Sequence, residues 1–271
     1  FSPRFAEQVR ETKRKLLTFL IDAKRRGKRV VGYGAAAKGN ARATEKKLLL
    51  VTAAAFPLVV LAGYFKSYYF SAFFDVPAIA NALVHAHAVV MSVWVLFFVM
   101  QTALIRSRNV KLHMTMGLAG IALAALVVVV GMATAYDAQL VRGAAPPGAN
   151  PHAFFLLPVS DMTLFVLFFS AAVYFRKRPT EHKSLMFLTA IAFTPAALFR
   201  IPVVPTDYAM LWAFGAPALL AVGALAWHSI AHGRVNRVFA AGVALVVAAV
   251  PLRPLIADSS AWLSIVAMLA P

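Results

Sequence analysis

Residues 78–105 read AIANALVHAHAVVMSVWVLFFVMQTALI, a stretch without a single Asp, Glu, Lys or Arg. A helix rises about 1.5 Å per residue and the hydrocarbon core of a bilayer is about 30 Å thick, so about 20 mostly apolar residues are needed to cross it. The stretch meets that length. It therefore predicts a helix that spans a membrane.

Six more apolar runs of similar length flank this stretch. Each is expected to be a helix, because open strands leave backbone polar groups unsatisfied in lipid. A last apolar piece, 260–270, is too short to span and is expected to lie at the surface. The sequence thus predicts an all-α polytopic membrane protein, with a seven-helix transmembrane bundle in residues 48–271 and spans at 48–66, 78–105, 112–135, 153–175, 184–204, 208–231 and 237–257.

Composition agrees with this class. The chain is 61% hydrophobic and only 14% charged, whereas soluble domains are about a quarter charged. Of its 27 Lys and Arg residues, 14 lie in residues 1–47 beside four acids, and the others sit mostly in the gaps between apolar runs. This distribution argues against a nucleic-acid partner and for the lipid bilayer. The chain has no cysteine, which excludes disulfides and thiolate chemistry.

The charges between the runs also predict an orientation. The gaps after the second, fourth and sixth runs hold nine basic residues and one acid, Glu181, whereas the other gaps and the tail hold four of each sign. Loops rich in Lys and Arg stay on the cytoplasmic side. We therefore expect a cytoplasmic N-terminus and, after seven spans, a C-terminus outside.

The basic segment 1–47 has a pattern of its own. Residues 4–29 are predicted to form an amphipathic helix, and residues 30–40, VVGYGAAAKGN, a strand that runs into a glycine-rich turn. Residues 1–40 resemble the opening of the C-terminal domain of sugar C-methyltransferases, on the stretch GYGAAAKGN at 32–40. The resemblance covers only a fragment of that domain, which suggests a fusion remnant. The whole segment 1–47 is expected to be cytoplasmic and, with a net charge of about +10, to bind anionic lipid headgroups.

Ionisable residues inside the predicted spans are the candidate functional residues, because they are costly in lipid and face the interior of a bundle. His85, His87 and Asp161 fall at one depth, roughly 10–14 Å below the outer surface, and Arg200 lies somewhat higher. Asp161 and Arg200 are expected either to form an ion pair that locks two helices or to act with His87 as a proton or anion relay. His85 lies about 200° around the helix from His87, so the two are expected to point in different directions.

The second span carries a polar stripe towards the interior. His87, Met91, Trp94, Phe98 and Gln101 recur at spacings of three and four residues and share one face.

A second layer of histidines lies at the cytoplasmic ends of the spans: His113, His182, His228 and His232. His113 and His182 each follow a basic cluster, RSRNVKLH at 106–113 and RKRPTEH at 176–182, which suggests either an internal repeat or interface anchoring that arose twice. His228 and His232 stand four residues apart on one face, a spacing that suits zinc. For each of these histidines a structural role at the interface is the alternative.

The membrane part, residues 48–270, resembles a family of uncharacterised bacterial seven-helix membrane proteins. The resemblance rests on Tyr68-Tyr69, His85-Ala-His87, Trp94, Gln101, Arg106, His113, Gly117, Asp161, His182-Lys183 and Arg200. It implies the fold and the inner membrane of a bacterium, and brings no activity with it.

Several functions remain open on these residues. One is a redox protein that binds haem b or a quinone, with cofactor ligands among His85, His87, His113 and His182 and buried polar groups at Trp94, Gln101, Asp161 and Arg200. Others are a proton- or anion-coupled transporter that uses Asp161, Arg200 and His87, a metal enzyme or metal protein built on His228 and His232, and a sensor or assembly protein without catalysis.

Overall fold

The computed structural model describes residues 3–28 and 35–271, with side chains for 7–28 and 50–271. These residues form helices and connecting turns, and no strand occurs among them. The chain divides into two compact units, residues 1–42 and 43–271.

The first unit contains α1 (Pro3–Arg25), which confirms the predicted N-terminal helix. Gly27 follows in the left-handed region at φ 66°, a conformation that favours glycine and ends the helix. The predicted strand falls largely on residues 29–34, outside the described residues. The predicted glycine-rich turn is wrong for residues 35–40, which are the start of α2 (Ala35–Tyr64). Three consecutive alanines there have the highest helix propensity of all residues.

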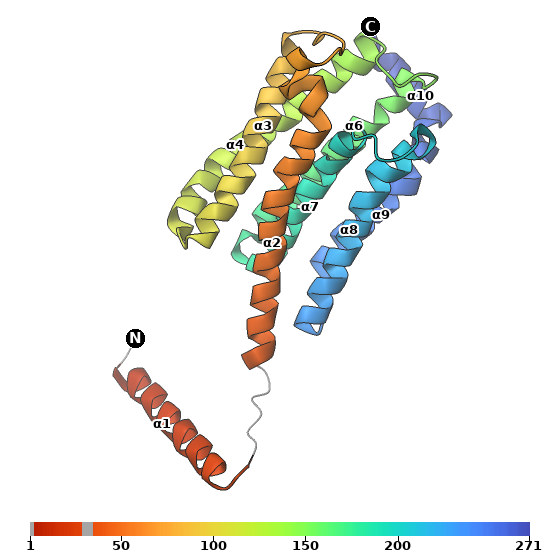
Figure 1. Ribbon diagram of the computed structural model, residues 1–271. Coiled ribbons are helices and arrows are strands. Elements are labelled where there is room, and N and C mark those ends of the chain that lie inside the picture. The colour runs from red at the N-terminus through yellow and green to blue at the C-terminus, as the bar shows by residue number, and fades with distance from the viewer. Residues whose placement is uncertain (1–2, 29–34) are drawn as a thin grey trace. The chain divides into compact units, whose positions relative to one another are not determined.

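The second unit is a bundle of long helices (Figure 1). After α2 come a π-helical turn, Phe65–Tyr69, and then α3 (Ala82–Arg106) and α4 (Val110–Tyr136). The short α5 (Pro151–Phe154) leads into α6 (Leu156–Tyr174), followed by α7 (Pro179–Leu198), α8 (Ala209–His232), α9 (Arg237–Ala257) and α10 (Ser260–Leu269). The main helix pairs in contact are α3 with α4, α6 with α7, and α8 with α9, each a hairpin of sequence neighbours.

Six helical segments of the described chain are long and apolar enough to cross a membrane: Leu50–Tyr69, Ala82–Arg106, Val110–Val141, Pro151–Lys177, Thr206–His232 and Arg237–Ala257. Each coincides with a run found in the sequence. The run predicted at 184–204 corresponds to α7, which is not among the six. Its first turns contain Glu181, His182 and Lys183, and these charged and polar groups lower the hydropathy of a 20-residue helix.

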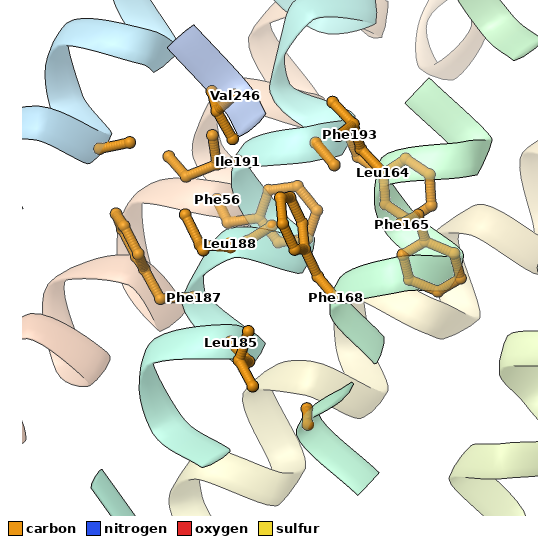
Figure 2. Close-up of a cluster of buried hydrophobic side chains, with 14 of the residues drawn as sticks. Phe56, Leu164, Phe165, Phe168, Leu185, Phe187, Leu188, Ile191, Phe193 and Val246 are labelled. Carbon is orange, nitrogen blue, oxygen red and sulfur yellow. The ribbon is translucent and has the colours of Figure 1, made fainter. Parts of the chain in front are cut away.

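Helix α7 lies at the centre of the bundle. Its residues from Ser184 to Leu198 are mostly buried, and Leu188 is fully so. Figure 2 shows how its side chains interleave with those of α6, with Phe165 and Phe193 4.5 Å apart between ring centroids. The helix is therefore surrounded by protein more than any other, which explains why it tolerates a lower hydropathy than its neighbours.

Asparagine side chains cap the first turn of several helices. Asn81 accepts a hydrogen bond from the Val84 backbone N–H, and Asn109 and Asn236 do the same for α4 and α9. Such caps satisfy amide groups that have no partner inside the helix. Asn81 also donates to Asp137 Oδ2 at 2.9 Å, which ties the start of α3 to the end of α4.

The C-terminal helix α10 is packed more closely than the sequence predicts. Val266 is fully buried against Phe155, the Trp262 indole N–H donates to the His152 carbonyl at 3.0 Å, and Tyr136 donates to the Leu269 carbonyl at 2.9 Å. A short apolar helix buries its surface most simply by folding back on its own bundle.

Candidate functional site

A cavity of about 650 Å³ opens at the end of the bundle where α2 finishes and α3 begins. Helices α2, α3, α4, α6, α7 and α8 all contribute to its wall. Ligand pockets in proteins typically occupy about 300–1,000 Å³ and combine apolar walls with a few polar groups. This cavity has both. Its polar groups are Tyr64, Ser67, Tyr68, Tyr69, His87, Thr134, Gln139, Arg142, Asp161 and Arg200, and its apolar ones include Phe56, Met91, Phe193 and Phe214.

His87 is the polar group that α3 contributes. Its Nδ1 is buried and has no hydrogen-bond partner within the described part of the chain. Gly131 on α4 makes room beside it, because a Cβ there would lie 2.5 Å from Met162 Cε and 4.0 Å from His87 Cε1. A buried imidazole nitrogen without a partner is costly unless a ligand or water completes it.

His85 points elsewhere, as the helical spacing predicts. It is exposed, and its Nδ1 lies 3.4 Å from the Tyr68 hydroxyl. It does not line the large cavity, so only one of the two histidines of the His-Ala-His motif belongs to the site.

The expected Asp161–Arg200 ion pair is wrong. Asp161 Oδ1 instead accepts from Arg253 Nη2 at 2.5 Å, and Arg253 Nε donates to Ser160 Oγ at 2.7 Å. The Arg253 guanidinium also lies over the Phe214 ring, 4.2 Å from its centroid. The buried carboxylate is therefore neutralised by α9, not by α7.

Arg253 is the residue that sequence reasoning missed, because it was counted with the charges of the loops and tail. The signal was present: residue 253 falls inside the run predicted at 237–257. A charged side chain so close to the end of a span can lie either in water or buried in the bundle. The hydropathy of the run does not distinguish these two positions.

Arg200 is left as the cation of the cavity. Its Nη1 donates to the Ala196 carbonyl at 2.6 Å, and its guanidinium lies 4.6 Å from the Tyr64 ring centroid. Arg142, the other arginine in the wall, is paired with Asp137 at 2.8 Å. In the region with described side chains, Arg200 has no carboxylate partner, so the cavity carries an uncompensated positive charge.

The stripe predicted on α3 faces the interior. Trp94 is only 2% exposed and meets Phe165 and Phe169 of α6 edge-on, at 5.1 and 5.6 Å between ring centroids. Trp94 Nε1 and Gln101 Oε1 are buried and lack partners among the residues whose side chains are described.

At the opposite end of the bundle, the structure brings His113 and His182 together. Their ring centroids are 6.3 Å apart and the ring planes meet at 77°. His228 and His232 form a separate pair, stacked at 4.0 Å and nearly parallel at 15°. The in-plane lone pairs of parallel rings do not converge, so this arrangement does not form the chelate that the i, i+4 spacing suggests. No group of three or more His, Cys, Asp or Glu that suits a metal is found in the described residues.

One known protein family matches part of the chain. Residues 2–54 match the family model of the C-methyltransferase C-terminal domain, in agreement with the resemblance seen in residues 1–40. No curated protein matches the chain significantly, and the same holds for the solved structures. The likeness therefore concerns α1 and the first part of α2 and includes no residue of the cavity, the first of which is Phe56.

Proposed function

We propose that this chain is a seven-helix protein of a bacterial inner membrane, with its N-terminus in the cytoplasm, that binds a quinone in the cavity beside His87 and Arg200. The six long apolar helices support the membrane assignment, and the proposal takes the largely buried α7 as a seventh span. The basic residues between α3 and α4 and between α6 and α7 support the orientation.

The observation that carries the ligand assignment is the presence, in one largely apolar wall, of a buried imidazole nitrogen without a partner and an arginine without a carboxylate partner among the described side chains. His87 has a buried nitrogen to offer, Arg200 has no carboxylate partner among the described side chains, and both line one cavity of about 650 Å³. A quinone is a neutral planar ring with carbonyl oxygens on opposite edges, and it needs hydrogen-bond donors from two sides. His87 comes from α3 and Arg200 follows the end of α7, so the two donors belong to different parts of the cavity wall.

The cavity suits a quinone better than a phospholipid. Phosphate groups are bound by several Arg and Lys side chains acting together, often as bidentate pairs. Here one arginine is uncompensated, and the second is held by Asp137. Phe56, Met91, Phe193 and Phe214 provide aromatic and thioether surface for a flat ring.

The N-terminal helix gives the protein a second contact with the membrane. Val9, Leu16 and Phe19 are each at least half exposed and fall on one side of a helix that also carries seven Lys and Arg residues beside three acids. An exposed apolar face beside Lys and Arg is the pattern of a helix that lies in the headgroup region of anionic lipids. We include binding of α1 to anionic headgroups in the proposal.

The test is binding of a short-chain benzoquinone to the full chain purified in lipid nanodiscs, followed by thermal shift and by quenching of tryptophan fluorescence. Saturable stabilisation is expected with the native chain and is expected to be lost in His87→Leu. The matched control is His85→Leu, two residues away and outside the cavity, which should bind normally.

Three results would overturn the assignment. They are no binding by the native chain, equal binding by both histidine variants, and equal competition by a saturated fatty acid. The last would identify an anion site for lipid carboxylates in place of a quinone site.

A further inference from the structure

We infer that His113, His182 and Gln101 form a binding site for a single transition-metal ion of the copper or zinc class, at the end of the bundle opposite the quinone cavity. The inference stands on a different set of residues and does not depend on the proposed function. It begins from the meeting of two imidazoles from different hairpins, α3–α4 and α6–α7, at 6.3 Å between ring centroids.

Each imidazole is oriented by a backbone carbonyl of the preceding helix. His182 Nδ1 lies 2.9 Å from the Ala172 carbonyl oxygen on α6, and the His113 ring lies against the backbone carbonyl of Gln101 on α3. Metal-binding histidines almost always use one ring nitrogen in this way, which fixes the tautomer and directs the other nitrogen at the metal. The same arrangement occurs twice here, once in each hairpin.

Each ring keeps a second nitrogen beyond the one that meets a carbonyl. His113 Nδ1 is buried and finds no partner in the described residues, and the contact to Ala172 leaves His182 with its Nε2. Metal–imidazole bonds are about 2.0–2.1 Å long, so two rings that share an ion have centroids roughly 5–6.5 Å apart. The observed separation falls within that range without movement of either helix.

Gln101 supplies the third ligand. Its Oε1 is buried without a partner in the described region, on the helix whose backbone carbonyl already orients His113. Water fills the remaining position of a four-coordinate ion. With no thiolate in the chain and two imidazoles as the main ligands, the donor set is one that suits zinc, copper and nickel, and not magnesium or calcium.

The surroundings distinguish this pair from the other histidines. His228 and His232 stack in parallel and present no converging lone pairs, and His85 is exposed beside Tyr68. Lys183 is adjacent to His182, and Lys111 precedes His113 by two residues. These positive charges oppose the binding of any cation, and of a dication most strongly.

The experiment is metal analysis of the full chain in detergent after loading with Cu⁺ or Zn²⁺ and removal of free ion. One ion per chain is expected in the native protein. Less than one tenth of that is expected in His113→Ala and in His182→Ala. His85→Ala is the matched control and should keep the ion, and Gln101→Leu should bind it more weakly.

A second measurement guards against variants that fail to fold. In the native chain, diethyl pyrocarbonate modification is read by mass spectrometry with and without metal, and the ion is expected to protect His113 and His182 while His85 reacts equally in both samples. Absence of a bound ion, binding that survives both alanine variants, or protection of His228 and His232 instead would each overturn the site. A Soret band in the purified protein would overturn it in favour of haem.

Discussion

Arg253 on α9 and Asp161 on α6 form an ion pair of 2.5 Å, with side chains only 6% and 12% exposed. The Ser160 hydroxyl and the Phe214 ring complete the surroundings of the guanidinium. Two charges so thoroughly removed from solvent are stable only together, because each alone would face the full cost of desolvation. The pair therefore fastens α9 to α6.

Removal of one partner is expected to destabilise the bundle strongly. Arg253→Gln leaves a buried carboxylate uncompensated and should cost about 3–5 kcal/mol. Arg200→Gln is the matched control and should cost far less, because Arg200 is exposed and contacts only a carbonyl and a ring. Thermal unfolding in detergent measures both.

The double variant Asp161→Leu/Arg253→Met completes this comparison. It should recover much of the stability lost in Arg253→Gln, since well-packed apolar residues often replace a buried ion pair without loss. Equal destabilisation by Arg200→Gln and Arg253→Gln would contradict the pairing.

Much of this fold is predictable from apolar run lengths alone. The run at 78–105 became α3, and each of the other runs also became a helix. The bounds differ most for α2, which begins at Ala35 and not at 48, and for α7, which is Pro179–Leu198 and not 184–204. Run length predicts these elements well because an apolar run of about 20 residues is much longer than a typical strand, which leaves a helix as the regular structure that fits it. The helical spacing of His85 and His87 likewise predicts correctly which of them faces the interior.

Contacts between helices were not predictable in the same way. Asp161 had two arginines within reach at a similar depth, Arg200 and Arg253, and depth says nothing about which helices are neighbours. The meeting of His113 with His182 was also open, since two similar basic segments suggest a repeat without placing its halves side by side. Helix neighbours depend on how side chains interlock, as Leu188 does against Gly242, and one sequence does not encode this in any short pattern.

Gly63 on α2 is a second point where contact between helices can be tested. A Cβ at this position would collide with the backbone of Ala197 on α7, whose carbonyl carbon would lie at 2.8 Å. Because backbone cannot move aside as a side chain can, Gly63→Ala should destabilise the bundle by about 1–3 kcal/mol.

Gly223→Ala is the control for this substitution. Nothing lies within 4 Å of a Cβ at Gly223 in α8, and replacing a helical glycine by alanine stabilises by roughly 0.5–1 kcal/mol. Thermal unfolding of the two variants in the same detergent should therefore shift in opposite directions. Equal shifts would show that α2 does not pack on α7 at this point.

Tyr64 is expected to position Arg200 for the ligand. The guanidinium lies 4.6 Å from the ring centroid, and such cation–π contacts contribute about 0.5–1 kcal/mol at exposed sites. Tyr64→Leu should therefore weaken quinone binding by about two- to fivefold, whereas Tyr64→Phe keeps the aromatic face and should bind as the native chain does. Titration of the benzoquinone in nanodiscs measures the difference, and equal affinities in the two variants would contradict this role.

Whether α7 crosses the membrane can be decided by cysteine labelling, because the chain contains no cysteine of its own. Lys177 and Val203 flank α7, and both side chains are exposed. With seven spans, an impermeant maleimide added to intact cells should label Val203→Cys and leave Lys177→Cys unlabelled until the membrane is permeabilised. Ser107→Cys and Ala144→Cys serve as references for the inner and outer loops next to α4. If α7 does not span, residues 177 and 203 lie on the same side, and Val203→Cys should behave like Ser107→Cys.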